Sequence, residues 1–286
     1  MQCESAEVRK CDAGVRPHSR TLALSHFSVW RLLDTPPAPG AWNMAVDAAL
    51  MRAVRGGAPP VLRFYRWDPP CLSLGRNQPA AGCYDLGALR AAGVEVVRRP
   101  TGGRAVLHDR ELTYSVVAAD GALGGPRESY AAINRALVAG LRRLGVEARL
   151  QPRTAARAPA PSLAPCFKEP AEGEVVAGGR KLVGSAQLRE DGVLLQHGSL
   201  LLEGDQREVR AWTLGAAPAD GGEAPASLAE LCGAAPSWER LTLALAAGWE
   251  EATGASLAPG ELSAAEAADA GRIRARFADP AWTWHH

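Results

Sequence analysis

A cysteine and a lysine fifteen residues apart are the side chains best suited to covalent chemistry in this chain. Cys166 lies in the segment PCFKEP, at the end of a proline-rich loop, and Lys181 lies in GGRKLVGSAQLR. The thiolate is the nucleophilic form of cysteine, yet only about 3% of a free thiol is ionised at pH 7. An ammonium group at about 4 Å can lower the pKa of a thiol by up to about three units. The pair therefore predicts a nucleophilic cysteine activated by lysine, provided that the fold brings the two together.

Both residues also have ordinary structural interpretations. A free cysteine is most often a small buried hydrophobic residue, but Cys166 lies outside any apolar periodicity. Lys181 could be a solvated strand residue, although its neighbours are small or apolar. Such an environment suits an ammonium that points at a thiolate or a carbonyl oxygen. The other cysteines show no CxxC pair and no metal-ligand spacing, so we expect reduced thiols and no metal site. These are Cys3, Cys11, Cys71, Cys83 and Cys232.

A second segment, RRPTGGRAVLHDRELTYSV, contains a glycine pair and a histidine. Gly102 and Gly103 permit a tight turn and a close approach of the backbone to a ligand, although a plain hairpin turn is the simpler interpretation. His108 could carry a proton, or it could be a structural histidine bonded to Asp109. His197, in LLQHGS, fits a core histidine on an apolar strand. The chain has neither GxGxxG after a strand nor GxxxxGK[ST], so no dinucleotide site or P-loop is indicated.

Composition excludes several classes of protein. The chain has 286 residues, 47% of them hydrophobic and 22% charged, as in ordinary globular proteins. A net charge of +1 argues against a protein that neutralises many phosphates of a nucleic acid. No run approaches the length of a membrane span. The first 27 residues lack the apolar region of a secretory signal. We expect them to be a disordered extension or the product of a start codon assigned too early, and we expect the protein to be cytoplasmic.

The hydrophobic pattern alternates between short strands and amphipathic helices. Strands are expected at 30–34, 61–67, 71–75, 94–99 and 111–117. Helices are expected at 42–54, 84–92, 127–144, 227–231, 238–251 and 261–275. The alternation in 61–67 predicts a half-buried strand. Residues 180–189 and 193–202 form a predicted hairpin, because the Asp191-Gly192 step suits a tight turn. The order predicts an α+β fold with mixed, largely antiparallel sheets and packed helices.

These segments together resemble the lipoate/biotin-ligase superfamily, in the branch of LipM-type octanoyltransferases. The resemblance rests on RRPTGGRAVLHDRELTYSV and on PCF…GRKLVGSAQ…GVLLQHGSL, and it extends over roughly 30–251, including the segment NMAVDAAL. It implies that Cys166 forms an acyl thioester and that Lys181 assists it. It also implies a set of substrate-binding residues. These are Arg99, Thr101, Gly102, Gly103, Arg104, His108, Gly184, Ser185 and Ala186.

The resemblance implies a lipoate/biotin-ligase-like catalytic domain over 28–255, followed by a C-terminal helix and tail at 256–286. The implied reaction transfers octanoate from octanoyl-acyl carrier protein to a lysine of a lipoyl domain or of the glycine-cleavage H protein, in lipoate biosynthesis. No cofactor, membrane or nucleic acid is expected to take part. The chain departs from this type at 171–174, where Ala-Glu-Gly-Glu replaces a small residue, an aromatic and Glu.

Three other functions remain open from the sequence. An ATP-dependent lipoate–protein ligase shares the glycine motif and the lysine but needs no cysteine. Against it stand Cys166 and the segment after Glu251, whose roughly 35 residues are too few for an accessory domain. An amidotransferase between carrier proteins uses a cysteine in the same way. A non-catalytic acyl-binding module would not need the Cys166/Lys181 pair.

Overall fold

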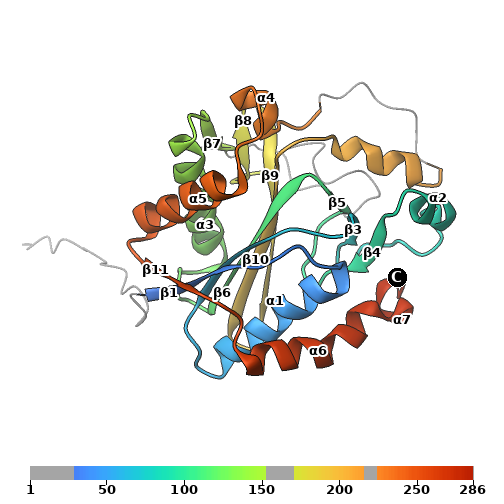
Figure 1. Cartoon of the computed structure of the whole chain (residues 1–286), viewed down its shortest axis with the longest axis horizontal. Helices are drawn as coiled ribbons and strands as arrows, with labels where there is room; N and C mark the ends of the chain where they lie inside the picture. The colour runs from blue at the N-terminus through green and yellow to red at the C-terminus, as the bar shows by residue number, and fades with distance from the viewer. Residues whose placement is uncertain (1–28, 153–170, 216–223, 286) are drawn as a thin grey trace, which may run out of the picture.

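An eight-stranded sheet forms the centre of the fold (Figure 1). The computed structural model describes residues 29–152, 171–215 and 224–285. Two pairings at one edge, β11–β1 and β1–β2, are parallel, and the others are antiparallel. Across the sheet the strands are β11 (Ser256–Gly260), β1 (Val29–Asp34), β2 (Val61–Tyr65), β6 (Glu111–Ala119), β10 (Val193–Leu201), β9 (Arg180–Glu190), β8 (Val175–Ala177) and β7 (Ala148–Leu150). The predicted mixed, largely antiparallel sheet is confirmed.

A second, three-stranded sheet has β3 (Cys71–Leu74) at its centre. β4 (Glu95–Arg98) pairs with β3 in parallel, and β5 (Val106–His108) pairs with it in antiparallel. The Gly102-Gly103 turn therefore joins strands that lie on opposite sides of β3. The simpler interpretation of this turn as a plain hairpin is wrong, because β3 separates the two strands that the turn connects. The next strand, β6, belongs to the large sheet.

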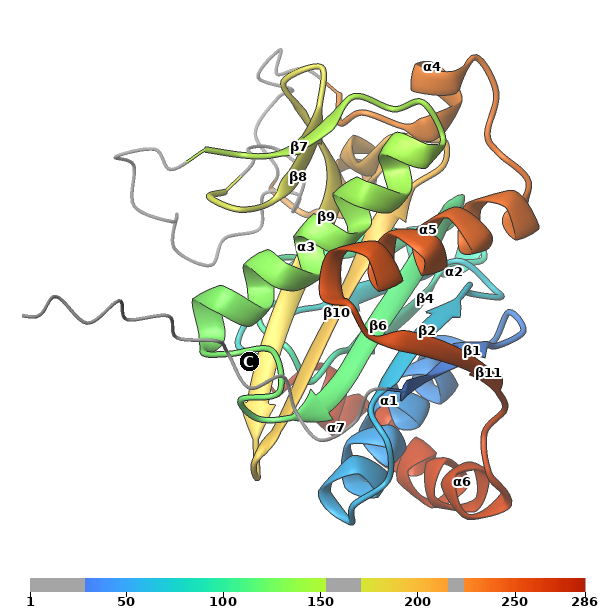
Figure 2. The same cartoon turned by 90° about the vertical axis from the view of Figure 1, so that its left-hand side faces the viewer.

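Helices cover both faces of the large sheet (Figure 2). α3 (Pro126–Arg143) and α5 (Trp238–Thr253) pack together on one face, and α1 (Gly40–Arg55) and α6 (Ala264–Ala278) pack together on the other. All residues of β2 are consequently buried, with Leu62 and Phe64 in one core and Val61 and Tyr65 in the other. The prediction of a half-buried strand here is wrong, since both sides of the sheet are covered.

Local sequence signals place most helices within a few residues. α6 begins at Ala264 and not at 261, because Ser263 caps it and Glu266 completes a capping box. The predicted hairpin between β9 and β10 is confirmed, and both Asp191 (φ 53°) and Gly192 (φ 76°) adopt the left-handed conformation of a tight turn. The remaining helices are α2 (Leu86–Ala91), η1 (Gln206–Trp212), α4 (Leu228–Cys232) and α7 (Pro280–Thr283). β5, β7, β8, β11, η1 and α7 had no counterpart among the predicted elements.

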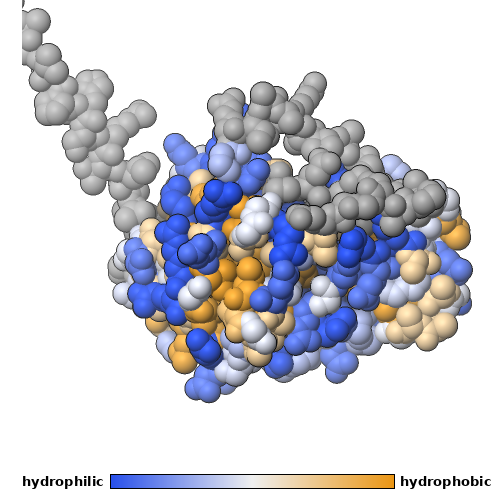
Figure 3. Space-filling view, turned by 90° about the horizontal axis from the view of Figure 1, so that it is seen from above, coloured by the Kyte–Doolittle hydropathy of each residue, from blue (hydrophilic) through white to orange (hydrophobic). Residues whose placement is uncertain are grey.

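The face of the molecule seen from above carries many polar residues (Figure 3). From above, charged and polar residues cover much of the molecule, with an apolar area between them (Figure 3). The large hydrophobic residues that are exposed in the described ranges lie on separate elements and need no special explanation. They are Val29, Leu86, Leu214 and Leu243. None of the helices in these ranges is both long and apolar enough to cross a membrane.

The crossing of α3 and α5 depends on two glycines, and this dependence can be tested. A Cβ at Gly248 would lie 2.1 Å from the backbone nitrogen of Gly140 and 2.5 Å from its Cα. Backbone atoms cannot move aside cheaply, so Gly248→Ala should lower the free energy of unfolding by about 3 kcal/mol. Gly271→Ala on α6 is the matched control, because its Cβ would meet no described atom within 4 Å. The control should be neutral or stabilising by up to about 1 kcal/mol. Equal denaturation midpoints for both variants would contradict this packing.

Candidate active site

A pocket lies between the small sheet and the large sheet. Ser73 and Val106 line it from the small sheet, and Tyr65, Thr113 and His197 line it from the large one. The empty volume is about 430 Å³, including the part open to solvent, and most of the wall is apolar. The apolar wall suits an aliphatic ligand with a few polar groups at one end.

Most of the predicted substrate-binding residues meet at this pocket. Those that line it directly are Arg99, Gly103, His108, Gly184, Ser185 and Ala186. Thr101, Gly102 and Arg104 belong to the loop at its rim. The Arg99 guanidinium donates hydrogen bonds to the carbonyl oxygens of Gly102 (2.8 Å) and Arg104 (2.7 Å) and so fixes the shape of this loop.

The glycine loop packs closely against the preceding loop. Gly103 has φ +93°, a conformation that disfavours other residues. A Cβ at Gly75 would lie 2.0 Å from the Gly103 carbonyl oxygen, so the two backbones touch. The close approach seen at the glycine pair is therefore made with the backbone of Gly75, and the predicted approach to a ligand stays a prediction.

Lys181 lies near the start of β9, three residues before Gly184, and is not one of the residues that line the pocket. Its ammonium donates a hydrogen bond of 2.7 Å to Glu174 Oε1, and both side chains are buried. The other carboxylate oxygen, Oε2, accepts from the backbone amide of Ala171 at 2.8 Å. Cys166 lies outside the described residues, so the predicted pairing of Cys166 with Lys181 stays a prediction.

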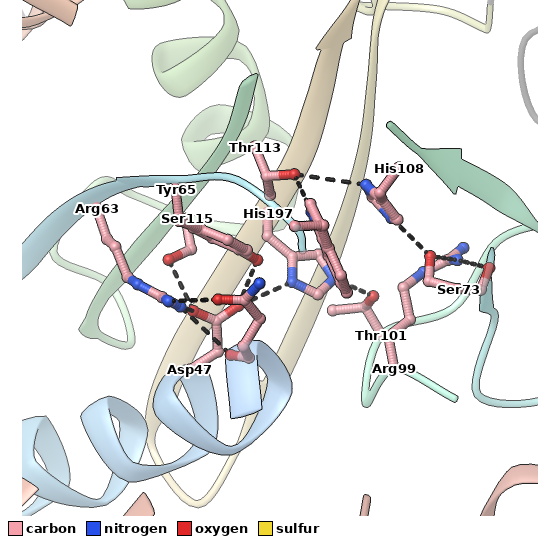
Figure 4. A network of polar contacts seen from close by, with 12 residues as sticks. Asp47, Arg63, Tyr65, Ser73, Arg99, Thr101, His108, Thr113, Ser115 and His197 are labelled. Atoms are coloured by element: carbon pink, nitrogen blue, oxygen red, sulfur yellow. Dashed lines mark hydrogen bonds and ion pairs between the residues drawn. The ribbon is translucent and has the colours of Figure 1, made fainter. Parts of the chain in front are cut away.

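A buried ionic network, absent from the predicted site, includes Tyr65 and His197 of the pocket wall (Figure 4). Asp47 Oδ1 accepts hydrogen bonds from Arg63 Nη1 (2.8 Å) and Ser115 Oγ (2.9 Å). Its Oδ2 accepts from the Tyr65 hydroxyl and lies 3.1 Å from His197 Nδ1. The sequence held a signal for this network, since Asp47 and Arg63 are opposite charges within apolar patterns. A buried charge requires a partner.

The network keeps Asp47 ionised. Burial acts to raise the pKa of Asp47, but the hydrogen bond with His197 and the charge of Arg63 outweigh it, and the pKa lies below its ordinary value. Burial, together with the charge of Asp47, raises the pKa of Tyr65 well above its ordinary value. Since an ionised carboxylate only accepts hydrogen bonds, we assign the proton of His197 to Nδ1.

His197 connects this network to the glycine loop. Its Nε2 lies 2.6 Å from Thr101 Oγ1, so the ring and that hydroxyl share a hydrogen bond. Asp47, His197 and Thr101 thus form a continuous chain from α1 to the rim of the pocket. The prediction of His197 as a core histidine is accurate for its burial, but its side chain also lines the pocket.

His108 lies on the opposite wall of the pocket. Its Nε2 is 2.8 Å from Ser73 Oγ, and its ring stacks on Trp67 with centroids 4.1 Å apart. Burial lowers the pKa of His108, although the hydrogen bond and charge of Glu111 act against this shift. The imidazole is therefore held neutral. The predicted partner Asp109 is wrong, because Asp109 pairs with Arg110 on the surface.

The described residues do not contain a group of His, Cys, Asp and Glu that could hold a metal ion. Most of the polar residues around the pocket are engaged with one another, whereas the buried hydroxyl of Ser199 has no hydrogen-bond partner among the described atoms. Their arrangement can bind a ligand, orient it and exchange a proton through a neutral histidine.

The neutral state of His108 makes stability depend on pH. The pKa of His108 in the folded protein is below its ordinary value of 6.5, so the unfolded chain binds the proton more readily as pH falls. His108 should therefore cost stability as pH decreases from about 7 to 5. His108→Gln, which can still bond to Ser73, should flatten this part of the curve in urea unfolding. The exposed variant His285→Gln should leave it unchanged, and an equal slope in His108→Gln would contradict the assignment.

Residues 39–247 match the family of lipoyl protein ligase A/B catalytic domains. A protein from Kyrpidia tusciae named Octanoyltransferase LipM is 48% identical over 274 residues, which cover 90% of this chain and 99% of that protein. A protein of the same name from Symbiobacterium thermophilum is 46% identical over 255 residues, covering 84% of this chain and 92% of that protein.

Solved structures agree with these relatives. A putative lipoate protein ligase from T. acidophilum with bound lipoic acid superimposes with a TM-score of 0.72 at 26% identity, covering 89% of this chain and 98% of that one. A lipoate-protein ligase A bound with ATP gives a TM-score of 0.74 at 25% identity, with the same coverage of both chains. With the match in sequence, the two-sheet architecture and the glycine loop at the pocket, the chain belongs to the lipoyl protein ligase A/B catalytic domain family.

Proposed function

We propose that this chain transfers an octanoyl group from octanoyl-acyl carrier protein to a lysine of lipoyl domains, including the H protein, in lipoate biosynthesis. The observation that carries the proposal is the 48% identity, along nearly the whole chain, with a protein named Octanoyltransferase LipM. The apolar pocket beside the glycine loop is the part of the described structure that suits an octanoyl chain. We place the reaction in the cytoplasm.

In the proposed first step, the Cys166 thiolate attacks the thioester carbonyl of the donor. A carbon–sulfur bond forms, and the tetrahedral intermediate collapses with release of the carrier's thiolate, which takes up a proton. Lys181 stabilises both the attacking thiolate and the oxyanion of the intermediate. One thioester replaces another, so this step needs no ATP.

In the second step, the ε-amine of the acceptor lysine attacks the octanoyl-Cys166 thioester, the acyl carbon–sulfur bond breaks, and an amide forms while the Cys166 thiolate is released. A lysine with an ordinary pKa near 10.4 is neutral in only about four molecules in ten thousand at pH 7. A base must therefore take its proton. His108 is a candidate because it is held neutral and lines the pocket.

The contacts of Lys181 support its proposed role as the partner of Cys166. Glu174 binds the ammonium through Oε1 and the Ala171 amide through Oε2. Ala171 follows Cys166 by five residues, a length of chain that spans at most about 18 Å. Glu174 thus joins the proposed catalytic lysine to the chain that follows the proposed nucleophile.

ATP-dependent ligation is the second candidate, because structural neighbours of 25–26% identity are named lipoate protein ligases. Transfer between carrier proteins is the third, since it would use the same cysteine. A ligase would require ATP and free acid, and an amidotransferase would take its octanoyl group from another lipoyl-type carrier.

Intact mass measurement after mixing with octanoyl-acyl carrier protein, without ATP, tests the first step. We expect a gain of one octanoyl group that hydroxylamine removes. The adduct should be absent in Cys166→Ala and present in the control Cys232→Ala, whose cysteine is exposed. An adduct that persists in Cys166→Ala would contradict the nucleophile. Modification of a lipoyl domain only with ATP and free octanoate would identify a ligase.

The role of Lys181 can be separated from its structural contact. Lys181→Gln keeps a donor for Glu174 but removes the positive charge. The rate of Cys166 acylation in single turnover should fall by about 10²–10³-fold, the usual loss when one stabilising donor is removed. Arg180→Gln, which removes a charge one residue away that pairs with Glu230, is the control and should react at the normal rate. Equal rates in both variants would exclude Lys181 from the reaction.

A further inference from the structure

Two consecutive arginines at the end of β4 bind loop carbonyls on different sides of the strand. Arg99 donates to the carbonyl oxygen of Ser73 (2.9 Å) and to the glycine loop at the rim of the pocket. Arg98, which is fully buried, makes a separate set of contacts that the proposed mechanism does not use. Its role is therefore open.

Arg98 binds several backbone carbonyl groups of the loop after β3. Its Nη1 donates to the carbonyl oxygens of Gly75 (2.5 Å), Gln78 (2.9 Å) and Arg76 (3.2 Å). Since a loop of this kind has no sheet ladder to satisfy its carbonyl groups, one guanidinium replaces several missing backbone donors.

The loop that Arg98 holds is the support of the glycine loop. The backbone amide of Arg76 donates to the Thr101 carbonyl oxygen at 2.8 Å. Gly75 lies so close to Gly103 that a Cβ at Gly75 would be 2.0 Å from the Gly103 carbonyl oxygen. A displacement of 75–78 would therefore displace the rim of the pocket.

The same arginine also binds the C-terminal helix α7. Arg98 Nε donates to the carbonyl oxygen of Thr283 at 2.8 Å, and Trp282 Nε1 donates to the carbonyl oxygen of Arg98 at 2.8 Å. α7 follows α6 directly and lies beside the small sheet (Figure 1). A helix of four residues has little stability of its own. The two hydrogen bonds therefore attach it to β4.

Burial of this arginine is unfavourable for the fold alone. Burial lowers the pKa of Arg98, and its Nη2 has no hydrogen-bond partner among the described atoms. Its described hydrogen bonds go to carbonyl oxygens and to no carboxylate. Well-packed apolar residues often fill such a space at lower cost. The benefit of Arg98 is the connection that it makes between two loops and a helix.

We propose that Arg98 is a positioning residue, which links α7 to the 75–78 loop and thereby fixes the glycine loop at the rim of the pocket. The C-terminal helix is then a support of the substrate site. The consequence for catalysis depends on the proposed function, because it requires that the pocket bind the acyl donor.

Hydrogen exchange tests the link independently of activity. In Arg98→Met, the amides of Arg76 and Gln78, which donate to the carbonyl oxygens of Thr101 and Gly75, should exchange at least about tenfold faster, since local opening becomes easier. Trp282→Phe, which removes the indole hydrogen bond but keeps an aromatic ring for the contacts with Arg276 and His285, should show a smaller increase in the same peptides. Trp238→Phe is the matched control, because it also removes one indole hydrogen bond, to Asp34 at 2.8 Å. Its exchange in 76–104 should be unchanged.

Kinetics with the octanoyl donor then separate positioning from a merely structural role. Arg98→Met should raise KM about tenfold with a smaller change in kcat, and Arg98→Lys should recover part of the loss. A lower yield of folded Arg98→Met, with an unchanged KM and unchanged exchange in 76–104, would overturn the proposal. If the variants exchange faster but the unaltered protein transfers no octanoyl group, the proposed function is contradicted and the positioning role of Arg98 stands. If Arg98→Met does not fold, Trp282→Phe and Arg98→Lys provide the same comparison.

Discussion

The buried ion pair between Asp47 and Arg63 is the contact on which the arrangement of the site depends. Both side chains are almost fully excluded from solvent, and their atoms are 2.8 Å apart. Removing one partner of such a pair typically costs about 3–5 kcal/mol, because the other charge stays buried. The pair fixes α1 against β2, and the contacts of Asp47 with Ser115 and His197 extend this constraint to β6 and β10. The position of one helix relative to three central strands is thus set by charge as well as by apolar packing.

Irregular backbone around the pocket is held by side-chain donors. The loops after β3 and β4 contain carbonyl groups that no sheet can satisfy, and a buried carbonyl without a partner is costly. Arg98 and Arg99 satisfy these groups from two directions, and Thr101 joins the same loop to His197. The glycine loop can therefore lie close to a ligand and still keep its shape, although its glycines have no side chains that would pack and hold it. Its rigidity comes from the network around it.

Local patterns predicted the longer elements well, but they predicted several short elements and the tertiary contacts poorly. The periodicity of 127–144 and the Asp191-Gly192 step are local signals, and both elements formed where they were expected. The glycine turn was interpreted as a simple hairpin because nothing in 94–117 reveals that β3 separates its two strands. Asp47 was missed because its partners come from three strands far away in sequence. The family motifs identified six residues of the pocket wall, since those residues lie within contiguous segments.

The ion pair between Lys181 and Glu174 limits how strongly the proposed nucleophile can be activated. An isolated ammonium could stabilise a nearby thiolate strongly, but this ammonium already bonds to a buried carboxylate at 2.7 Å. A thiolate that shares it becomes the second anion beside one cation, and each anion weakens the benefit to the other. Moderate activation suits a thioester exchange, because the nucleophilicity of a thiolate falls as it becomes more stable. In the proposed mechanism, Glu174 thus orients the Lys181 ammonium and limits the stabilisation that this ammonium gives to the Cys166 thiolate.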